Sequence, residues 1–188
     1  MSHSIAVLVG SLRRGSYTRK VAKTLIELAP SSLSCEIVEI GDLRLYNADL
    51  ETDTPPPEWV AFRERIRESS AVLFATPEYN RSVPGVLKNA IDVGSRPKAT
   101  NAFARKPAAI VSASIGAISG FGANHHLRQM LVFLDMPAMQ QPEAYIGHAD
   151  KLFNEAGELV VEGTREFLRA FMEAFAEWTE KLAEVPVR

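Results

Sequence analysis

The chain alternates between short aliphatic runs and segments in which apolar residues recur at helical spacing, and this alternation limits the possible folds more than any other feature. The aliphatic runs have the length and composition of strands that are buried on both faces of a parallel sheet. We predict strands over residues 5–9, 35–40, 71–75, 107–113 and 144–146. We predict helices whose buried stripes fall within residues 17–29, 59–66, 83–91, 123–134 and 167–182. Strand and helix units in this order imply an α/β protein with a parallel sheet, helices on both faces and right-handed crossovers.

The number of strands narrows the choice between the common parallel sheets. Five strands without a sixth favour the order 2-1-3-4-5 of a flavodoxin-like three-layer sandwich. The length of 188 residues suits one domain, so we expect residues 1–188 to form a single domain, with residues 148–163 as a small hairpin within it. Ligands of such sheets bind outside the carboxyl ends of the strands, so the loops after the first, third and fourth strands should carry the chemistry.

Composition excludes several functional classes. A formal net charge of -2 and the absence of a lysine- and arginine-rich run give no reason to expect nucleic acid or a membrane surface as a partner. No apolar stretch approaches the roughly 20 residues that span a bilayer, and no signal peptide is recognised, so we expect a cytoplasmic protein. The single cysteine, Cys35, allows no internal disulfide, and its place in a predicted strand favours packing over reactivity.

Metal chemistry is also not expected. His125 and His126 are adjacent, whereas two ligands on one helix face stand three or four residues apart. We therefore expect both histidines at the surface or at an interface.

The first predicted strand runs into the sequence GSLRRGSYT, which is neither of the common nucleotide-binding loops. The two glycines have the spacing of a nucleoside-triphosphate loop, but Ser16 and Tyr17 stand where that loop has lysine and Ser or Thr. The dinucleotide fingerprint fails as well, because Leu12 replaces its second glycine and would keep the backbone from a pyrophosphate.

The same loop does suit a single terminal phosphate. Hydroxyls come from Ser11, Ser16 and Thr18, and Arg13 supplies a guanidinium that can bind a phosphate through two hydrogen bonds. The free amides of the helix start favour a dianion. Alternatively, Ser16 only caps the helix and the arginines are solvated.

The loop after the third strand, TPEYNRSVPG, further favours a bound ligand at this edge of the sheet. Pro77 and Pro84 stiffen its two ends, so that backbone groups are held ready to recognise the edge of a flat heterocycle. Asn80 adds an amide, and Tyr79 adds a flat apolar wall. Alternatively, the segment is an ordinary turn before a helix, with Ser82 as the cap.

The loop after the fourth strand, SASIGAISGFGANHH, is rich in small residues. Ser112, Ser114 and Gly116 offer small side chains and exposed amides, so a planar ring can lie against them. The alternative is simple flexibility. One monophosphate pocket and two loops for a flat ring, placed around a five-stranded sheet, describe a site for flavin mononucleotide (FMN).

The sequence resembles the NADPH-dependent FMN reductase family, and most of all its bacterial quinone and chromate reductase branch. The resemblance lies in GSLRRGSYT after the first strand and in TPEYNRSVPGVLKNAIDVGSRP after the third, with length and element order in agreement over nearly the whole chain. Two positions depart from it. Thr18 stands where many relatives have asparagine, and Val93-Gly94 replaces a common Trp-Leu pair.

The resemblance implies a function and a set of site residues. The implied function is transfer of electrons from NADPH or NADH through bound FMN to a quinone-like acceptor, or to chromate, azo compounds or free flavin. The implied mechanism is ping-pong, and no side chain acts as nucleophile or general acid in it. The residues implied for the FMN phosphate are Ser11, Arg13, Ser16, Tyr17 and Thr18. Those implied for the flavin ring are Pro77, Glu78, Tyr79, Asn80 and Ser82 on one side, and Ser112, Ser114 and Gly116 on the other.

Two further expectations concern partners and alternatives. Family members form homodimers and often homotetramers, and residues 130–134, MLVFL, leave no polar face at the end of their predicted helix. Contact with another subunit and burial under the C-terminal helix explain that run equally well. The main alternative function is a flavodoxin-type FMN electron carrier, but such carriers are strongly acidic, and a net charge of -2 argues against one.

Overall fold

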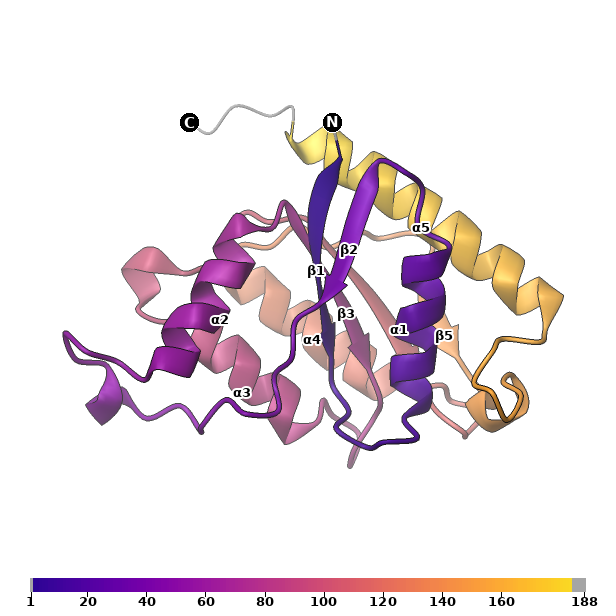
Figure 1. Cartoon of the computed structure of the whole chain (residues 1–188), viewed down its shortest axis with the longest axis horizontal. Coiled ribbons are helices and arrows are strands. Elements are labelled where there is room, and N and C mark those ends of the chain that lie inside the picture. The colour runs from indigo at the N-terminus through magenta and orange to yellow at the C-terminus, as the bar shows by residue number, and fades with distance from the viewer. Residues whose placement is uncertain (1, 184–188) are drawn as a thin grey trace.

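The computed structural model describes residues 2–183, which form one parallel five-stranded sheet of order β2-β1-β3-β4-β5 with helices on both faces (Figure 1). The sheet order and the three layers are those predicted. The strands are β1 (His3–Val9), β2 (Leu33–Ile37), β3 (Ala71–Thr76), β4 (Ala108–Ala113) and β5 (Ala144–Ile146). The α-helices are α1 (Tyr17–Glu27), α2 (Pro57–Glu68), α3 (Gly85–Gly94), α4 (Phe121–Phe133) and α5 (Glu162–Ala183). Short 3-10 turns lie at Ala48–Leu50, Lys98–Thr100 and Ala149–Lys151.

The three central strands are aliphatic because they are covered on both faces. Every residue of β3 and β4 is buried, and β1 is buried from Ile5 onward. Alternate residues of these strands enter two separate hydrophobic cores. One core packs against α2, α3 and α4, and the other packs against α1 and α5, as the two helix layers in Figure 1 show.

The second strand lies two to three residues earlier than predicted. Its pairing with β1 covers Leu33–Ile37, not residues 35–40, and ends where Ile37 lies opposite Val7. The Val38 N–H makes the last backbone hydrogen bond to β1, 3.0 Å from the Val7 carbonyl, and the side chains of Val38 and Ile40 are buried in the core that contains residues of α2 and α3. Their alternation therefore reflects a buried connecting segment and not a strand.

Proline sets two other boundaries. The fourth strand begins at Ala108 and not at residue 107, because Pro107 has no N–H to donate to a neighbouring strand. Likewise α3 begins at Gly85, after Pro84, so Val83 precedes the helix in which it was placed. The hairpin expected in residues 148–163 is confirmed by an antiparallel bridge between Phe153 and Leu159.

The end of α4 settles one of the two explanations of its apolar run. Leu131 and Leu134 are buried in the core that α4 shares with α2 and α3, whereas α5 packs into the core on the other face of the sheet. Val132 and Phe133 are 81% and 72% exposed. Burial of this run under the C-terminal helix is therefore wrong, because the sheet separates the two helices.

Within residues 2–183, no helix combines the length and the hydrophobicity that a membrane crossing requires.

Candidate functional site

The loops after β1 and β3 meet at the carboxyl edge of the sheet, which is the lower edge in Figure 1. The Gly10 N–H donates to the Ala75 carbonyl over 2.8 Å, and a Cβ added at Gly10 would lie 3.3 Å from the Pro77 ring. Glycine at this position thus allows the two loops to approach closely. A cavity of about 420 Å³ lies between them, lined by Gly10, Leu12, Arg13, Tyr79, Pro84, Gly85 and Val86.

The loop after β1 ends in a capped helix. The Ser16 hydroxyl accepts a hydrogen bond of 3.1 Å from the Arg19 N–H, so the predicted N-cap of α1 is confirmed. Ser11, Ser16 and Thr18 are all buried, while Arg13 and Leu12 are exposed. The first turn of α1 contains no acidic residue, so its amides keep their attraction for an anion.

The arginines that follow β1 have different surroundings. Arg13 lines the cavity beside Tyr79 and, among residues 2–183, makes neither a side-chain hydrogen bond nor an ion pair. Arg14 faces a different cavity, behind α1. Arg19 is bound by Glu39 through two hydrogen bonds of 2.8 and 2.5 Å, which hold the pKa of the Glu39 carboxyl below its ordinary value. Arg13 is consequently the guanidinium most available to a ligand in the cavity.

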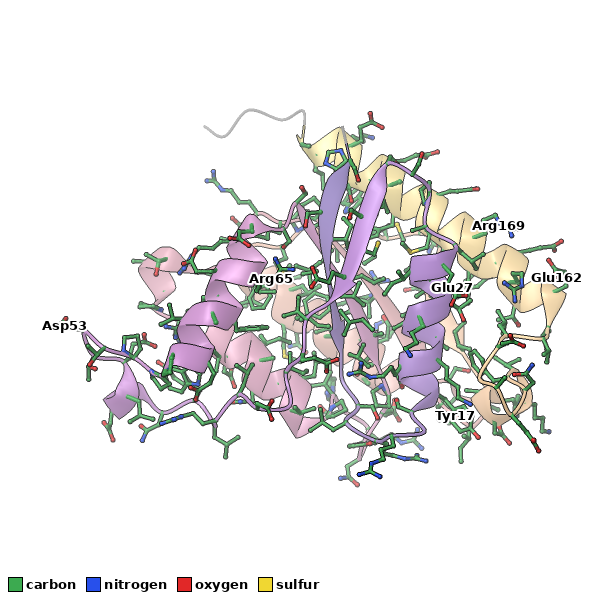
Figure 2. All side chains as sticks on the ribbon, viewed as in Figure 1. Tyr17, Glu27, Asp53, Arg65, Glu162 and Arg169 are labelled. Atoms are coloured by element: carbon green, nitrogen blue, oxygen red, sulfur yellow. The ribbon has the colours of Figure 1, made fainter. Side chains whose placement is uncertain are left out.

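Tyr17 turns away from this cavity. Its ring stacks on Phe153 of the hairpin with centroids 6.5 Å apart, and the Lys20 ammonium lies 5.3 Å from the Tyr17 ring centroid. What Tyr17 and Thr18 offer toward the loop are the backbone amides at the start of α1. In Figure 2, Tyr17 is labelled at the carboxyl-edge end of that helix.

The loop after β3 is a tight hairpin turn. Tyr79 and Ser82 exchange two backbone hydrogen bonds of 3.0 Å, and Asn80 and Arg81 between them have φ values of 51° and 64°. Consecutive residues with positive φ are the signature of a two-residue turn, and non-glycine residues adopt it at some cost. The Thr76 hydroxyl donates to the Pro77 carbonyl over 2.8 Å. The loop is therefore held in one shape by its own bonds.

Glu78 ties this loop to α4. Its Oε2 accepts a hydrogen bond of 3.1 Å from the Ala123 N–H, in the first turn of α4. The N-cap of that helix is Gly120, with φ 75°, which has no side chain to do this. Ser82 makes a second tie, because its hydroxyl is hydrogen-bonded to His126 Nδ1 at 3.0 Å. The idea that Ser82 merely caps α3 is wrong, since Pro84 is the N-cap and no side chain bonds there.

The loop after β4 turns its serines inward and its isoleucines outward. The fully buried Ser112 donates to the Ser119 carbonyl over 2.8 Å, and the Ser114 hydroxyl accepts from the Gly116 N–H over 3.1 Å. Ile115 and Ile118 are exposed. Together with the exposed Leu12, these isoleucines add apolar side chains to the loops at the carboxyl edge, and neither isoleucine was among the predicted site residues. The sequence could have indicated them, because residues 112–120 otherwise contain only serine, alanine and glycine.

The two histidines are surface residues of α4 with separate partners. His125 Nε2 lies 3.0 Å from the Tyr145 hydroxyl, and Phe121 packs on the His125 ring with centroids 4.1 Å apart. Burial, followed by the neighbouring Glu143, raises the pKa of Tyr145. In the described part of the chain, no three His, Cys, Asp or Glu side chains are grouped as a metal site requires.

The donor set at this edge fits FMN. A helix N-terminus, buried hydroxyls and Arg13, which forms no ion pair within residues 2–183, suit its phosphate. A rigid turn carrying a half-exposed tyrosine, in one cavity with Leu12 of the loop after β1, suits its flat ring.

Comparison with known proteins agrees with this chemistry. A profile of the NADPH-dependent FMN reductase family matches residues 3–151. A quinone reductase of Pseudomonas putida is 64% identical over 178 residues, which are 95% of each chain. A 2-hydroxy-1,4-benzoquinone reductase of Burkholderia is 45% identical, over 95% of this chain and 97% of its own. Among solved structures, the flavoenzyme NAD(P)H:(acceptor) oxidoreductase of Paracoccus denitrificans superimposes with a TM-score of 0.89 at 41% identity, over 95% of this chain and 98% of that one.

Proposed function

The chain belongs to the NADPH-dependent FMN reductase family and is an NAD(P)H-dependent, FMN-containing quinone reductase, and on this premise we propose how its residues act and in what order its substrates bind. The observation that carries the proposal is the cavity between the two loops, which Arg13 lines from the loop after β1 and Tyr79 lines from the loop after β3.

The loop after β1 binds the phosphate of FMN in this proposal. Arg13 donates to two phosphate oxygens, and the hydroxyls of Ser11 and Ser16 complete the cradle. Tyr17 and Thr18 contribute their backbone amides at the start of α1, where the helix dipole favours a dianion. Thr18 is buried, which supports a role for its amide more than for its side chain.

The loops after β3 and β4 hold the flavin ring. In this proposal Tyr79 presents its aromatic face to the ring, Asn80 presents its backbone N–H and side-chain amide, and the Pro77 ring stiffens the loop beneath them, while Ser114 and Gly116 close the opposite side. Glu78, Ser82 and Ser112 act indirectly, because their side chains are engaged in the bonds that shape these loops. Some residues thus face the ring while others hold the loops in shape. Both roles are needed, because hydrogen-bond donors stabilise a bound group best when they are already held in the right position.

When bound, FMN supplies the ring that takes hydride from NAD(P)H and delivers electrons to the acceptor. We propose that both substrates bind over one apolar surface, to which Tyr79 and Leu12 contribute from the walls of the cavity. A single surface cannot hold both substrates at once, so NAD(P)⁺ leaves before the acceptor enters, which is a ping-pong order. Flat quinones suit the surface best. Azo compounds, free flavin and chromate are further acceptors in the proposal.

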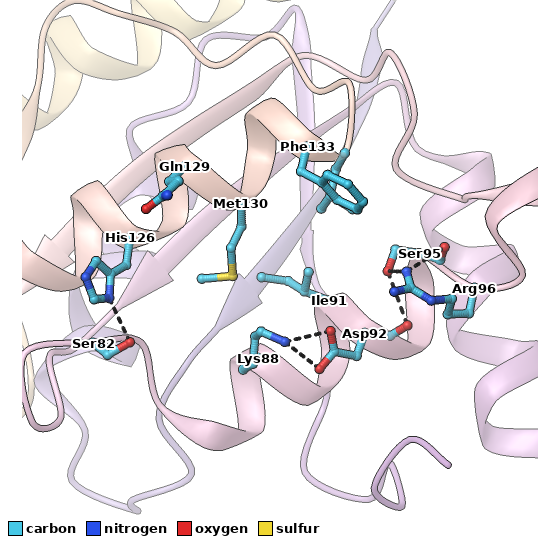
Figure 3. A pocket seen from close by; sticks show the side chains of 11 residues that line it. Ser82, Lys88, Ile91, Asp92, Ser95, Arg96, His126, Gln129, Met130 and Phe133 are labelled. Atoms are coloured by element: carbon cyan, nitrogen blue, oxygen red, sulfur yellow. Dashed lines mark hydrogen bonds and ion pairs between the residues drawn. The ribbon is translucent and has the colours of Figure 1, made fainter. Parts of the chain in front are cut away.

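The proposal includes a homodimer or homotetramer. A cavity of about 510 Å³ lies between α3 and α4 (Figure 3), and Met130 and Phe133 of α4 lie beside it. Val132 and Phe133 are exposed at the end of α4, and such large apolar side chains are commonly covered by another subunit. The cavity also carries the Lys88–Asp92 ion pair and Arg96, so both signs of charge are available to a second copy.

We place the reductase in the cytoplasm and treat residues 1–188 as one FMN-binding domain. The cytoplasm supplies NAD(P)H, and burial raises the pKa of the single Cys35 thiol to about 11, so the thiol stays protonated there.

The test is the visible absorption spectrum of protein that has been saturated with FMN and freed of excess flavin. We expect a retained flavin band that bleaches rapidly under anaerobic NADPH or NADH and returns when a benzoquinone is added. A band that is retained but does not bleach would indicate an electron carrier. Initial-rate plots at several quinone concentrations should be parallel, and intersecting plots would contradict the ping-pong order.

A further inference from the structure

Leu12, in the loop after β1, lies between the cavity beside Tyr79 and the segment that follows β2. It lines the cavity, and its side chain is 56% exposed. A Cβ added at Gly41 would lie 3.1 Å from Leu12 Cδ2 and 3.7 Å from Leu12 Cδ1, so both methyl groups lie against the backbone of Gly41. The glycine thus leaves free the space that the leucine side chain occupies.

The segment after β2 is itself held in place by buried side chains. Asn89 of α3 is buried, and its Oδ1 accepts a hydrogen bond of 2.8 Å from the Tyr46 N–H. Its Nδ2 donates to the carbonyls of Leu43 and Arg44, over 3.1 Å each. The indole N–H of the fully buried Trp59 in α2 donates to the Arg44 carbonyl as well, over 3.1 Å. In Figure 1 this segment runs from β2 past α3 toward α2. The loop after β1 therefore packs on a rigid support.

The cavity that Leu12 lines is mainly apolar. Among the lining residues in the described part of the chain, Arg13 alone carries a charge, and in the proposed function its guanidinium binds the FMN phosphate. The side chains that remain for an acceptor are those of Leu12, Tyr79, Pro84 and Val86. Leu12 and Tyr79, which is 46% exposed, come from two different loops. An acceptor that covers them removes apolar area from water only if it has an apolar face of its own.

We propose that Leu12 is a specificity-determining residue, which selects flat acceptors with an apolar face, such as ring-fused quinones, over small hydrophilic anions. The inference rests on the proposed function, because it names the acceptor class of the same site. Covering a leucine side chain with an apolar ring changes a binding or rate constant by about tenfold, and a hydrated anion gains nothing from this contact. Gly41 acts through Leu12, since it fixes where the leucine side chain lies.

The test uses the full chain saturated with FMN, reduced photochemically without NAD(P)H and mixed anaerobically with one of two acceptors. Reduction of 2-methyl-1,4-naphthoquinone to its hydroquinone takes two electrons and two protons from the reduced flavin. Two ferricyanide ions take one electron each, and the two protons pass to water. For Leu12→Ser we expect the second-order rate constant of flavin reoxidation to fall about tenfold with the naphthoquinone and to change by less than about twofold with ferricyanide. Leu12→Met keeps an apolar side chain of similar volume and should restore the naphthoquinone rate.

The matched control is Leu45→Ser, the same substitution at a leucine that is 77% exposed and is not among the residues lining the cavity. It should leave both rate constants unchanged. Equal losses with both acceptors in Leu12→Ser, or the same naphthoquinone loss in Leu45→Ser, would overturn the proposal.

Gly41→Ala tests the support beneath Leu12. The φ of Gly41 lies outside the left-handed region, so alanine suits the backbone, but its Cβ must displace a Leu12 methyl group. We expect the naphthoquinone rate constant to fall by about two- to threefold, and to fall no further when Gly41→Ala is added to Leu12→Ser, because the displaced side chain is then absent. Additive losses would show that Gly41 does not act through Leu12.

A second readout requires no electron transfer. In a calorimetric titration, 2-naphthol, a flat apolar molecule that the flavin does not reduce, should bind the FMN-saturated wild type and bind Leu12→Ser about tenfold more weakly. Equal affinities would contradict the assignment.

Failure of this inference differs from failure of the proposed function. If the reduced flavin shows the acceptor selectivity described but neither NADPH nor NADH bleaches it, the proposed function fails while the role of Leu12 stands. If both nucleotides bleach the flavin and Leu12→Ser changes neither acceptor rate, the role of Leu12 fails while the proposed function stands.

Discussion

The loops after β1 and β3 line the same cavity but use their side chains in opposite ways. In the loop after β1, Arg13 has no protein partner within residues 2–183, and Leu12 is exposed. In the loop after β3, Glu78 bonds to the first turn of α4, and Ser82 bonds to His126. The first loop thus leaves its Arg13 guanidinium without a partner among residues 2–183, whereas the second uses its polar side chains to hold its own shape.

The difference fits the roles that we propose for the two loops. A phosphate is bound by side chains and amides that have no partner in the empty protein, since a donor already engaged inside the protein gains little from a ligand. The edge of a flat ring is recognised by backbone groups at fixed positions, and these need support from neighbouring side chains. Substitutions in the first loop should therefore change affinity, and substitutions around the second should first change stability.

The largest effect is expected for Arg13→Ala. Loss of a charge-assisted bond to the FMN phosphate should weaken FMN binding by about 1.5–3 kcal/mol, while the free energy of unfolding of the flavin-free protein should change by less than about 0.5 kcal/mol. Quenching of flavin fluorescence measures the affinity. Arg81→Ala is the matched control in the other loop, because that side chain is 72% exposed and, within residues 2–183, forms an ion pair with Glu78 alone. Unchanged FMN affinity in the Arg13 variant would remove this residue from the site.

A somewhat smaller effect is expected for Gly122→Ala, which tests the support of the second loop. The new Cβ would lie 2.9 Å from both the Arg81 carbonyl oxygen and the Glu78 Oε2, so the turn must shift, at a cost of about 1–3 kcal/mol in the free energy of unfolding. Urea denaturation measures this cost. Gly163→Ala in α5 is the control, because a Cβ there meets nothing within 4 Å and should stabilise the helix by up to about 1 kcal/mol. Equal effects of the two substitutions would show that α4 does not confine the turn.

The smallest effect is expected for Glu39→Gln, which removes the partner of Arg19 on the helix that follows the first loop. The exposed ion pair should contribute about 0.2–1 kcal/mol to the free energy of unfolding and little to FMN affinity. The hydrogen bond from Arg19 lowers the pKa of Glu39 from its ordinary 4.5 in the folded state, so the contribution is complete above that value and is lost as the pH falls through the lowered pKa. Urea titrations of wild type and variant should accordingly converge in acid. A difference that persists there would mean that the stabilisation is not ionic.

The sequence by itself determined the sheet order, the two helix layers and the three loops that follow β1, β3 and β4 at the carboxyl edge. Each of these follows from local patterns, because a buried parallel strand must be aliphatic over its whole length and a helix beside the sheet must repeat its apolar residues at helical spacing. The cap at Ser16 was predictable for the same reason, since an N-cap bonds only to its own helix. The second strand was misplaced because Val38 and Ile40 are buried without belonging to the sheet.

The tertiary structure alone decided which side chains in those loops remain available. Nothing local distinguishes Arg13 from Arg14, yet they face different cavities on the two sides of their loop. Glu78 caps a helix 45 residues away in the chain, so no nearby residue foretold that its carboxylate was already engaged. The exposure of Phe133 likewise depends on the sheet that stands between α4 and α5. Hydrogen bonding and burial join residues that are distant in sequence, and only the folded chain brings such partners together.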